Sequence, residues 1–125
     1  MKIGVDRLQS DFLELGYDDV QQARDANGVC YAIIPDFEIP VGSFAGRRIS
    51  LAIPAPANYP QGIGASVHIK AEPILVEKGQ VQDVRNVCDS ALGGDWQYWS
   101  YRFVLVQANP AAELMSQIHG IFKRN

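Results

Sequence analysis

The chain has 125 residues, of which 47% are hydrophobic and 20% charged, and its formal net charge is -3. This length is typical of a single domain, here residues 1–125, whose core needs no disulfide. The mildly acidic balance, without a basic run, argues against nucleic acid or an anionic membrane as the main partner. No apolar stretch reaches membrane-spanning length, and charged residues occupy the N-terminus where a signal peptide is apolar, so we expect a cytoplasmic protein.

The two expected helices lie at the ends of the chain. Apolar residues recur at Val5, Leu8, Phe12 and Leu15, which is helical spacing, and Gly16 supplies a stop. Residues 18–25 are polar and fit either a further helical turn or a loop. A second helix begins at Asn109-Pro110 and carries an apolar stripe of Leu114, Ile118, Ile121 and Phe122.

Three strands are expected between the helices, at residues 29–34, 47–53 and 66–70. The first is apolar on both faces, so Cys30 is predicted to be buried and inert, and the prolines of residues 35–40 are predicted to interrupt the ladder. In the third strand Val67 and Ile69 point inward, while His68 is predicted to be an ordinary surface histidine. The short connections between these strands favour antiparallel pairing.

The sequence is less decisive after residue 76. Residues 77–86 are polar and aperiodic, which predicts a long loop leading to Cys88. Residues 95–106 are rich in aromatic residues and fit helix or strand equally. Cys30, Cys88, His68 and His119 lack the spacing of a zinc site, and a disulfide is not expected in a cytosolic protein, so no metal or cofactor is predicted.

Residues 86–99 are the candidate functional stretch. They hold Cys88, a predicted Gly93-Gly94-Asp95 turn and the tryptophans Trp96 and Trp99. A thiol just outside a sheet and ahead of a glycine turn is a plausible nucleophile. The alternative is that Cys88 is a small buried hydrophobe beside core tryptophans.

The order of several motifs resembles the ubiquitin-conjugating enzyme family. Residues 48–54 followed by Asn58-Tyr59-Pro60 resemble its strand and Tyr-Pro turn, and residues 87–96 resemble its active-site cysteine with a tryptophan eight residues later. Residues 35–37 (Pro-Asp-Phe) and 96–100 (Trp-Gln-x-x-Ser) are similar to bacterial members. The resemblance covers residues 5–122 and implies an α+β fold with an N-terminal helix, an antiparallel meander of three or four strands and a C-terminal helix.

The function implied by this resemblance is thiol acyl transfer. Cys88 would accept a ubiquitin-like modifier from an activating enzyme as a thioester and pass it to an acceptor. Asp89 and Asp95 are candidates to orient and deprotonate an incoming amine, and the Gly93-Gly94 amides are candidate oxyanion donors. The implied partners are the activating enzyme, the modifier and a deubiquitinase-like protease, often in antiphage settings.

One motif of the family is missing. Its His-Pro-Asn tripeptide, expected before the cysteine, is absent, and Asn86 or Gln80 would have to replace its asparagine. A second interpretation is therefore a catalytically inactive member that binds a modifier or an activating enzyme. A third is a peptide- or small-molecule-binding domain with Trp96 and Trp99 lining a pocket. An exposed Cys88 thiol beside a groove would favour catalysis, and a thiol packed under Trp96 would favour a scaffold.

Overall fold

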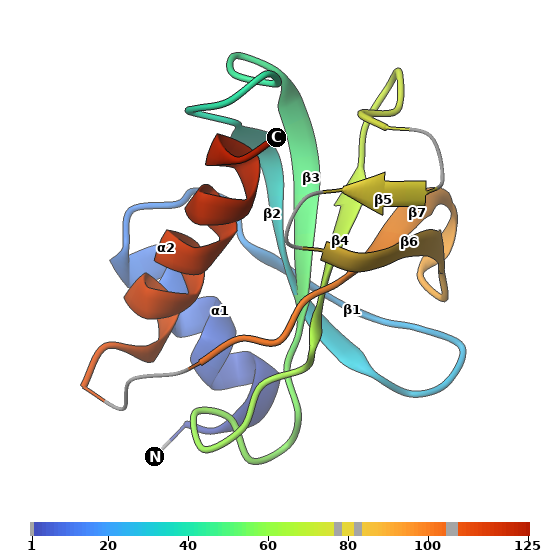
Figure 1. Ribbon diagram of the computed structural model, residues 1–125. Helices are drawn as coiled ribbons and strands as arrows, with labels where there is room; N and C mark the ends of the chain where they lie inside the picture. Colours follow the sequence, from blue (N-terminus) through green and yellow to red (C-terminus); the bar gives the residue numbers. More distant parts are fainter. Residues whose placement is uncertain (1, 77–78, 82–83, 105–107) are drawn as a thin grey trace.

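An antiparallel sheet with a helix at each end of the chain makes up the computed structural model, which describes residues 2–76, 79–81, 84–104 and 108–125 (Figure 1). The order is α1 (Gly4–Glu14), β1 (Gln21–Arg24), β2 (Cys30–Glu38), β3 (Arg48–Pro54), β4 (Ser66–Lys70), β5 (Gly79–Val81), β6 (Val84–Ser90), β7 (Gly93–Ser100) and α2 (Pro110–Lys123). The α+β class, both helices and the antiparallel pairing are confirmed. The expected three or four strands were too few, because the described residues form a sheet of seven, in the order β1-β2-β3-β4-β7-β6-β5.

Two of the differences lie at the start of the sheet. Strand β1 occupies polar residues where a helical turn or loop was expected, and it pairs with β2 from Gln21↔Ile33 to Arg24↔Cys30. The ladder between β2 and β3 is interrupted at Pro35, as predicted, by a bulge between Ile34 and Phe37, but the strand resumes after it and continues to Glu38. Within the bulge Pro35 has no partner on β3, so its missing N–H costs no ladder hydrogen bond. The next residue, Asp36, has a φ of 57°.

The other differences lie in the second half. The loop predicted over residues 77–86 is replaced in its described part by β5 and β6, and the undecided aromatic run begins as strand β7. The turn between β6 and β7 is formed by Ala91 and Leu92, because Ser90 pairs with Gly93. The predicted Gly93-Gly94-Asp95 turn is therefore the start of β7, and residues 105–106 of the aromatic run lie outside the described residues.

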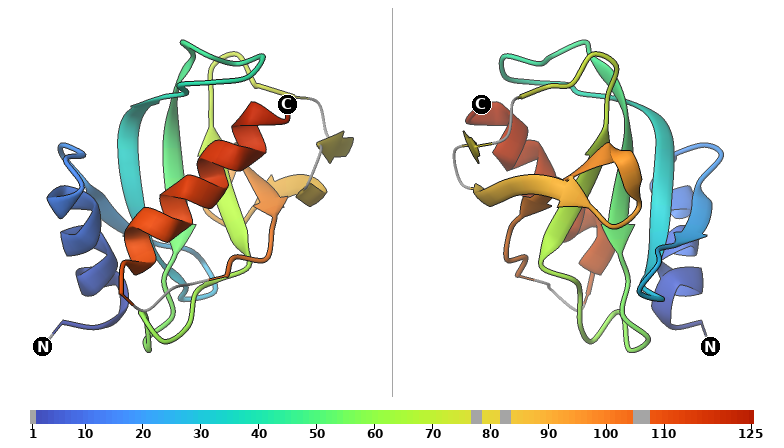
Figure 2. Two further views of the ribbon diagram at one scale, coloured as in Figure 1. Left: turned by 60° about the vertical axis from the view of Figure 1, so that its left-hand side comes forward. Right: turned by 90° about the vertical axis from the view of Figure 1, so that its right-hand side faces the viewer.

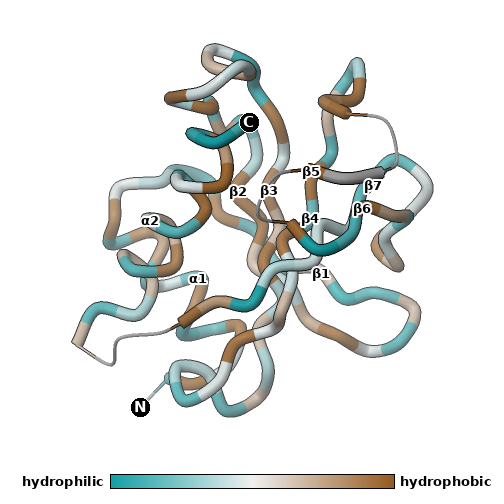
Figure 3. Tube along the Cα trace, viewed as in Figure 1, coloured by the Kyte–Doolittle hydropathy of each residue, from teal (hydrophilic) through white to brown (hydrophobic). Residues whose placement is uncertain are grey.

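Both helices pack on one face of the sheet (Figure 2). In α1, Leu8 and Phe12 are buried, while Leu15 is exposed, and Gly16 ends the helix with a φ of 101°. In α2 the predicted stripe is buried, and Phe122 packs against the indole of Trp99 with ring centroids 6.0 Å apart. Apolar residues recur along the central strands and both helices (Figure 3). Among the described residues, no helix is long and apolar enough to cross a membrane.

The C-terminal end of α2 is held against the β2–β3 connection at Gly42. A Cβ atom at this position would overlap the carbonyl oxygen of Phe122, so only glycine allows the helix to approach this closely. Gly46 has a similar backbone, with a φ of 89° against 84° for Gly42, but no atom lies within 4 Å of its Cβ position.

Replacing Gly42 with alanine should therefore destabilise the fold much more than the same change at Gly46. Gly46→Ala should cost about 1 kcal/mol through its left-handed backbone, and Gly42→Ala about 2 kcal/mol more through overlap with the helix backbone. Urea denaturation followed by circular dichroism measures both. Equal losses would show that α2 does not seat on Gly42 as described.

Candidate functional site

Cys88 lies in the middle of β6, where it pairs with Tyr98 of β7. Its side chain is half-buried, and the prediction that the thiol lies just outside the sheet was wrong because residues 84–90 pair as a strand. Trp99, which is fully buried, pairs with the preceding residue, Val87. Cys30, predicted to be buried, is also half-buried, because it is the first residue of β2.

The other predicted catalytic residues fall into two groups. Asn86 is exposed and, two residues before Cys88 on the same strand, lies on the same side of the sheet as the thiol. Asp89 and Asp95 are also exposed, but they line a neighbouring cleft together with Gly94. Cys88 does not line that cleft. The side chain of Gln80, the other suggested replacement for the missing asparagine, lies outside the described residues.

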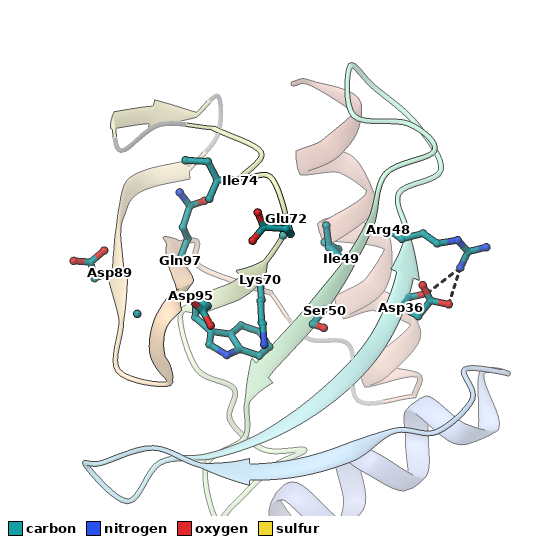
Figure 4. Close-up of a pocket in the computed structure, with 13 residues that line it drawn as sticks. Asp36, Arg48, Ile49, Ser50, Lys70, Glu72, Ile74, Asp89, Asp95 and Gln97 are labelled. Carbon is teal, nitrogen blue, oxygen red and sulfur yellow. Dashed lines mark hydrogen bonds and ion pairs between the residues drawn. The ribbon is translucent and has the colours of Figure 1, made fainter.

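The cleft lies where β3 begins and β4 ends, beside the start of β7, and has a volume of about 730 Å³ (Figure 4). Its apolar lining comes from Ile49, Ala71, Ile74 and Trp96, and its charged lining from Asp36, Arg48, Lys70, Glu72, Asp89 and Asp95. Of the two tryptophans expected to line a pocket, only Trp96 does so. Sequence reasoning named Asp89 and Asp95 but missed Asp36, Arg48, Lys70 and Glu72, because only the sheet order brings their separate segments together.

Arg48 is fixed at one edge of the cleft by two carboxylates. Its guanidinium lies 3.0 Å from Asp36 and 3.1 Å from Glu38, and all three side chains are exposed. Exposed pairs of this kind contribute less than about 1 kcal/mol to stability, so their main effect is to hold the charges in place. The neighbouring Arg47 donates to the carbonyl oxygen of Pro73, which ties the segment after β4 to the start of β3.

A buried polar cluster around His68 lies beside the cleft, on the sheet face opposite the helices. His68 pairs with Tyr98, and the adjacent pair contains Gln97, which lines the cleft. His68 is only 2% exposed, so the prediction of a surface histidine was wrong. Its Nε2 lies 2.9 Å from Ser66 Oγ, and its Nδ1 lies 2.6 Å from Ser90 Oγ. The rings of Tyr31 and Tyr98 flank the imidazole edge-on at 4.8 and 5.2 Å. His68 does point away from the helices, but the curled β6–β7 hairpin and the two tyrosines cover it.

The hydrogen bonds of this cluster assign its protons. Ser90 Oγ already accepts from the backbone N–H of Leu92, so its own proton is best directed to Nδ1 of His68. Nε2 then carries the imidazole proton and donates to Ser66. Desolvation lowers the pKa of His68 to about 4, against a smaller opposing effect of Asp25. A neutral, inaccessible imidazole is not placed to act on a substrate, and its role is to join β4 to β6.

Comparison with known proteins leaves the site to be interpreted from its own geometry. No protein-family model, curated protein or solved structure matches this chain.

Acid should destabilise the protein through His68. Because the folded pKa of about 4 lies below the unfolded value of about 6.5, the unfolded state takes up the proton first as pH falls. This contribution is complete above about pH 6.5 and is lost toward pH 4, which amounts to about 2–3 kcal/mol between pH 7 and 4.5. Urea denaturation across this range measures it.

The matched control is the second histidine. His119 is exposed, so His119→Gln should keep the pH dependence, whereas His68→Gln should flatten it and lower stability at pH 7. An unchanged slope in His68→Gln would show that other groups cause the acid sensitivity. Asp25, whose pKa is lowered chiefly by the hydrogen bond from Tyr31, adds its own loss only below about pH 4.

Proposed function

We propose that this chain is a conjugating-enzyme-like domain that binds a ubiquitin-like modifier or its activating enzyme without carrying the modifier as a thioester. The cytoplasmic location expected from the sequence belongs to the same proposal. Its support comes from the resemblance of residues 5–122 and from the α+β arrangement of a helix, an antiparallel meander and a closing helix.

The observation that carries the proposal is the position of Cys88 relative to the cleft. The backbone of Cys88 is committed to the ladder with Tyr98, and the half-buried thiol lies outside the cleft of about 730 Å³. An acyl-transfer nucleophile needs open space at the sulfur for a tetrahedral intermediate and donors aimed at its oxyanion. A binding surface needs only an accessible, chemically mixed cleft, which the ends of β3, β4 and β7 supply.

Binding should therefore survive loss of the thiol. We expect Cys88→Ala to bind a ubiquitin-like modifier and its activating enzyme with wild-type affinity in isothermal titration calorimetry. Ile74→Ala combined with Trp96→Ala should weaken binding at least about tenfold, which corresponds to 1.4 kcal/mol, because both side chains line the cleft. Ile3→Ala combined with Val104→Ala is the control, since both are exposed and outside the cleft. Lost binding in Cys88→Ala would contradict the proposal.

A second candidate is a thioester-forming conjugating enzyme, in which Cys88 accepts the modifier. It is favoured by one specific arrangement: the thiol is only half-buried, and Asn86 lies on the same side of β6 two residues before it. An asparagine amide at that position is a suitable oxyanion donor if the hairpin opens. Asp89 and Asp95, in the adjoining cleft, would then face the incoming amine.

A non-reducing gel separates the two candidates. The protein is incubated with the activating enzyme, the modifier and ATP, and our proposal expects no reducible adduct from the wild type. Under the second candidate an adduct forms, disappears in reducing buffer, is abolished by Cys88→Ala and persists in Cys30→Ala, the matched cysteine control. Detection of that pattern would replace the binding function with the catalytic one.

A further inference from the structure

A second cleft adjoins the first across the Arg48 ion pair. It has a volume of about 660 Å³ and lies between the segment after α1, the bulge of β2 and helix α2. Asp36 and Arg48 line both clefts, so their ion pair forms a low ridge between them. We call the two clefts together the acidic groove.

The groove concentrates negative charge. Arg48 and Lys70 are the only lysines or arginines among the lining residues, and the lining carboxylates are Asp18, Asp19, Asp36, Glu38, Glu72, Asp89 and Asp95. The whole chain has a net charge of only -3, so the surface outside the groove is positive on balance. Within the described part of the chain, Asp18, Asp19, Glu72 and Asp95 form no salt bridge. Carboxylates lining a concave surface attract cations more strongly than the same charges on a flat one.

Each cleft also has an apolar lining. Tyr17, Phe37 and Met115 line the second cleft, as Ile49, Ile74 and Trp96 line the first. Lysine and arginine match this combination, because their alkyl stems lie on apolar surface while their charged ends reach carboxylates. The aromatic rings of Tyr17 and Trp96 can add cation–π attraction.

The ridge selects the shape of the ligand. Arg48 and Asp36 line both clefts and separate them, so one compact side chain or small molecule does not fill both. An extended polypeptide crosses such a ridge and places successive side chains on either side of it. A short peptide is long enough to reach both clefts, because about 12 extended residues span up to about 40 Å.

We propose that the acidic groove binds an extended, basic segment of a partner polypeptide. The inference rests on the proposed function in one respect, that the segment belongs to the modifier or to the activating enzyme. The groove would then recognise charge and extension, and the folded part of the partner would lie outside it.

Fluorescence anisotropy with a labelled peptide of about 12 residues, alternating arginine or lysine with glycine and leucine, tests the groove directly. The peptide should bind, and its affinity should fall as the salt concentration rises. It should also bind more tightly than an acidic peptide of the same pattern. Asp18→Asn with Asp19→Asn neutralises one cleft, and asparagine tolerates the φ of 57° at position 19. Glu72→Gln with Asp95→Asn neutralises the other. Each pair should weaken binding about fivefold.

Two further variants distinguish a charged groove from damage to the fold. Asp6→Asn with Glu14→Gln removes the same charge outside both clefts and should change affinity less than about twofold. Arg48→Gln releases Asp36 and Glu38 and should tighten binding about threefold. Any of four results would overturn the proposal. The acidic peptide could bind as tightly as the basic one, or the control pair could weaken binding as much as the groove pairs do. Binding could also be weakened by only one of the two groove pairs, or be weakened by Arg48→Gln.

The outcomes also separate this inference from the function on which it rests. If the modifier or activating enzyme binds equally to the wild type and to both groove pairs, the groove proposal fails while the binding function stands. If the basic peptide binds as expected and neither partner protein binds, the groove proposal stands and the binding function fails.

Discussion

The bridge from Ser66 through His68 to Ser90 is the constraint on which the second half of the structure depends. Strand β7 lies between β4 and β6 in the sheet, so a contact from His68 to Ser90 requires the β6–β7 hairpin to curl toward the face opposite the helices. The imidazole is buried, and a buried polar group without partners would cost about 1–3 kcal/mol. Both ring nitrogens are bonded, so the curl and the burial of His68 stabilise each other.

That curl has a consequence for the surface. The hairpin carries Asp89 at the end of β6 and Asp95 at the start of β7, and both line the first cleft. Held in a curled position, the hairpin gives the cleft a wall opposite the start of β3. Helix packing on the other face fixes the sheet itself, through Trp99 against Phe122 and Gly42 against the end of α2. The cleft is thus shaped from both faces of one sheet.

The sequence predicted those elements whose apolar residues recur at a regular period. Helices α1 and α2 and strands β3 and β4 follow clear apolar periods, and they were predicted to within about two residues. Strands β1 and β6 are polar, and they form because a partner strand is adjacent, which local sequence does not reveal. The same reason explains His68: position in β4 predicts which face it occupies, but not that a distant hairpin covers that face.

The candidate site shows a related limit of spacing arguments. The eight residues from Cys88 to Trp96 match a familiar interval, yet an interval along the chain does not fix geometry. In this fold the interval spans a tight hairpin, with Cys88 opposite Tyr98 and Asp89 opposite Gln97. A loop around an exposed thiol would use the same residues. In the hairpin, Cys88 pairs within the ladder, Ser90 bonds to the buried His68, and Asp89 and Asp95 line the cleft. The Cys88 thiol therefore lies apart from the cleft, and the proposed binding by the cleft does not depend on it.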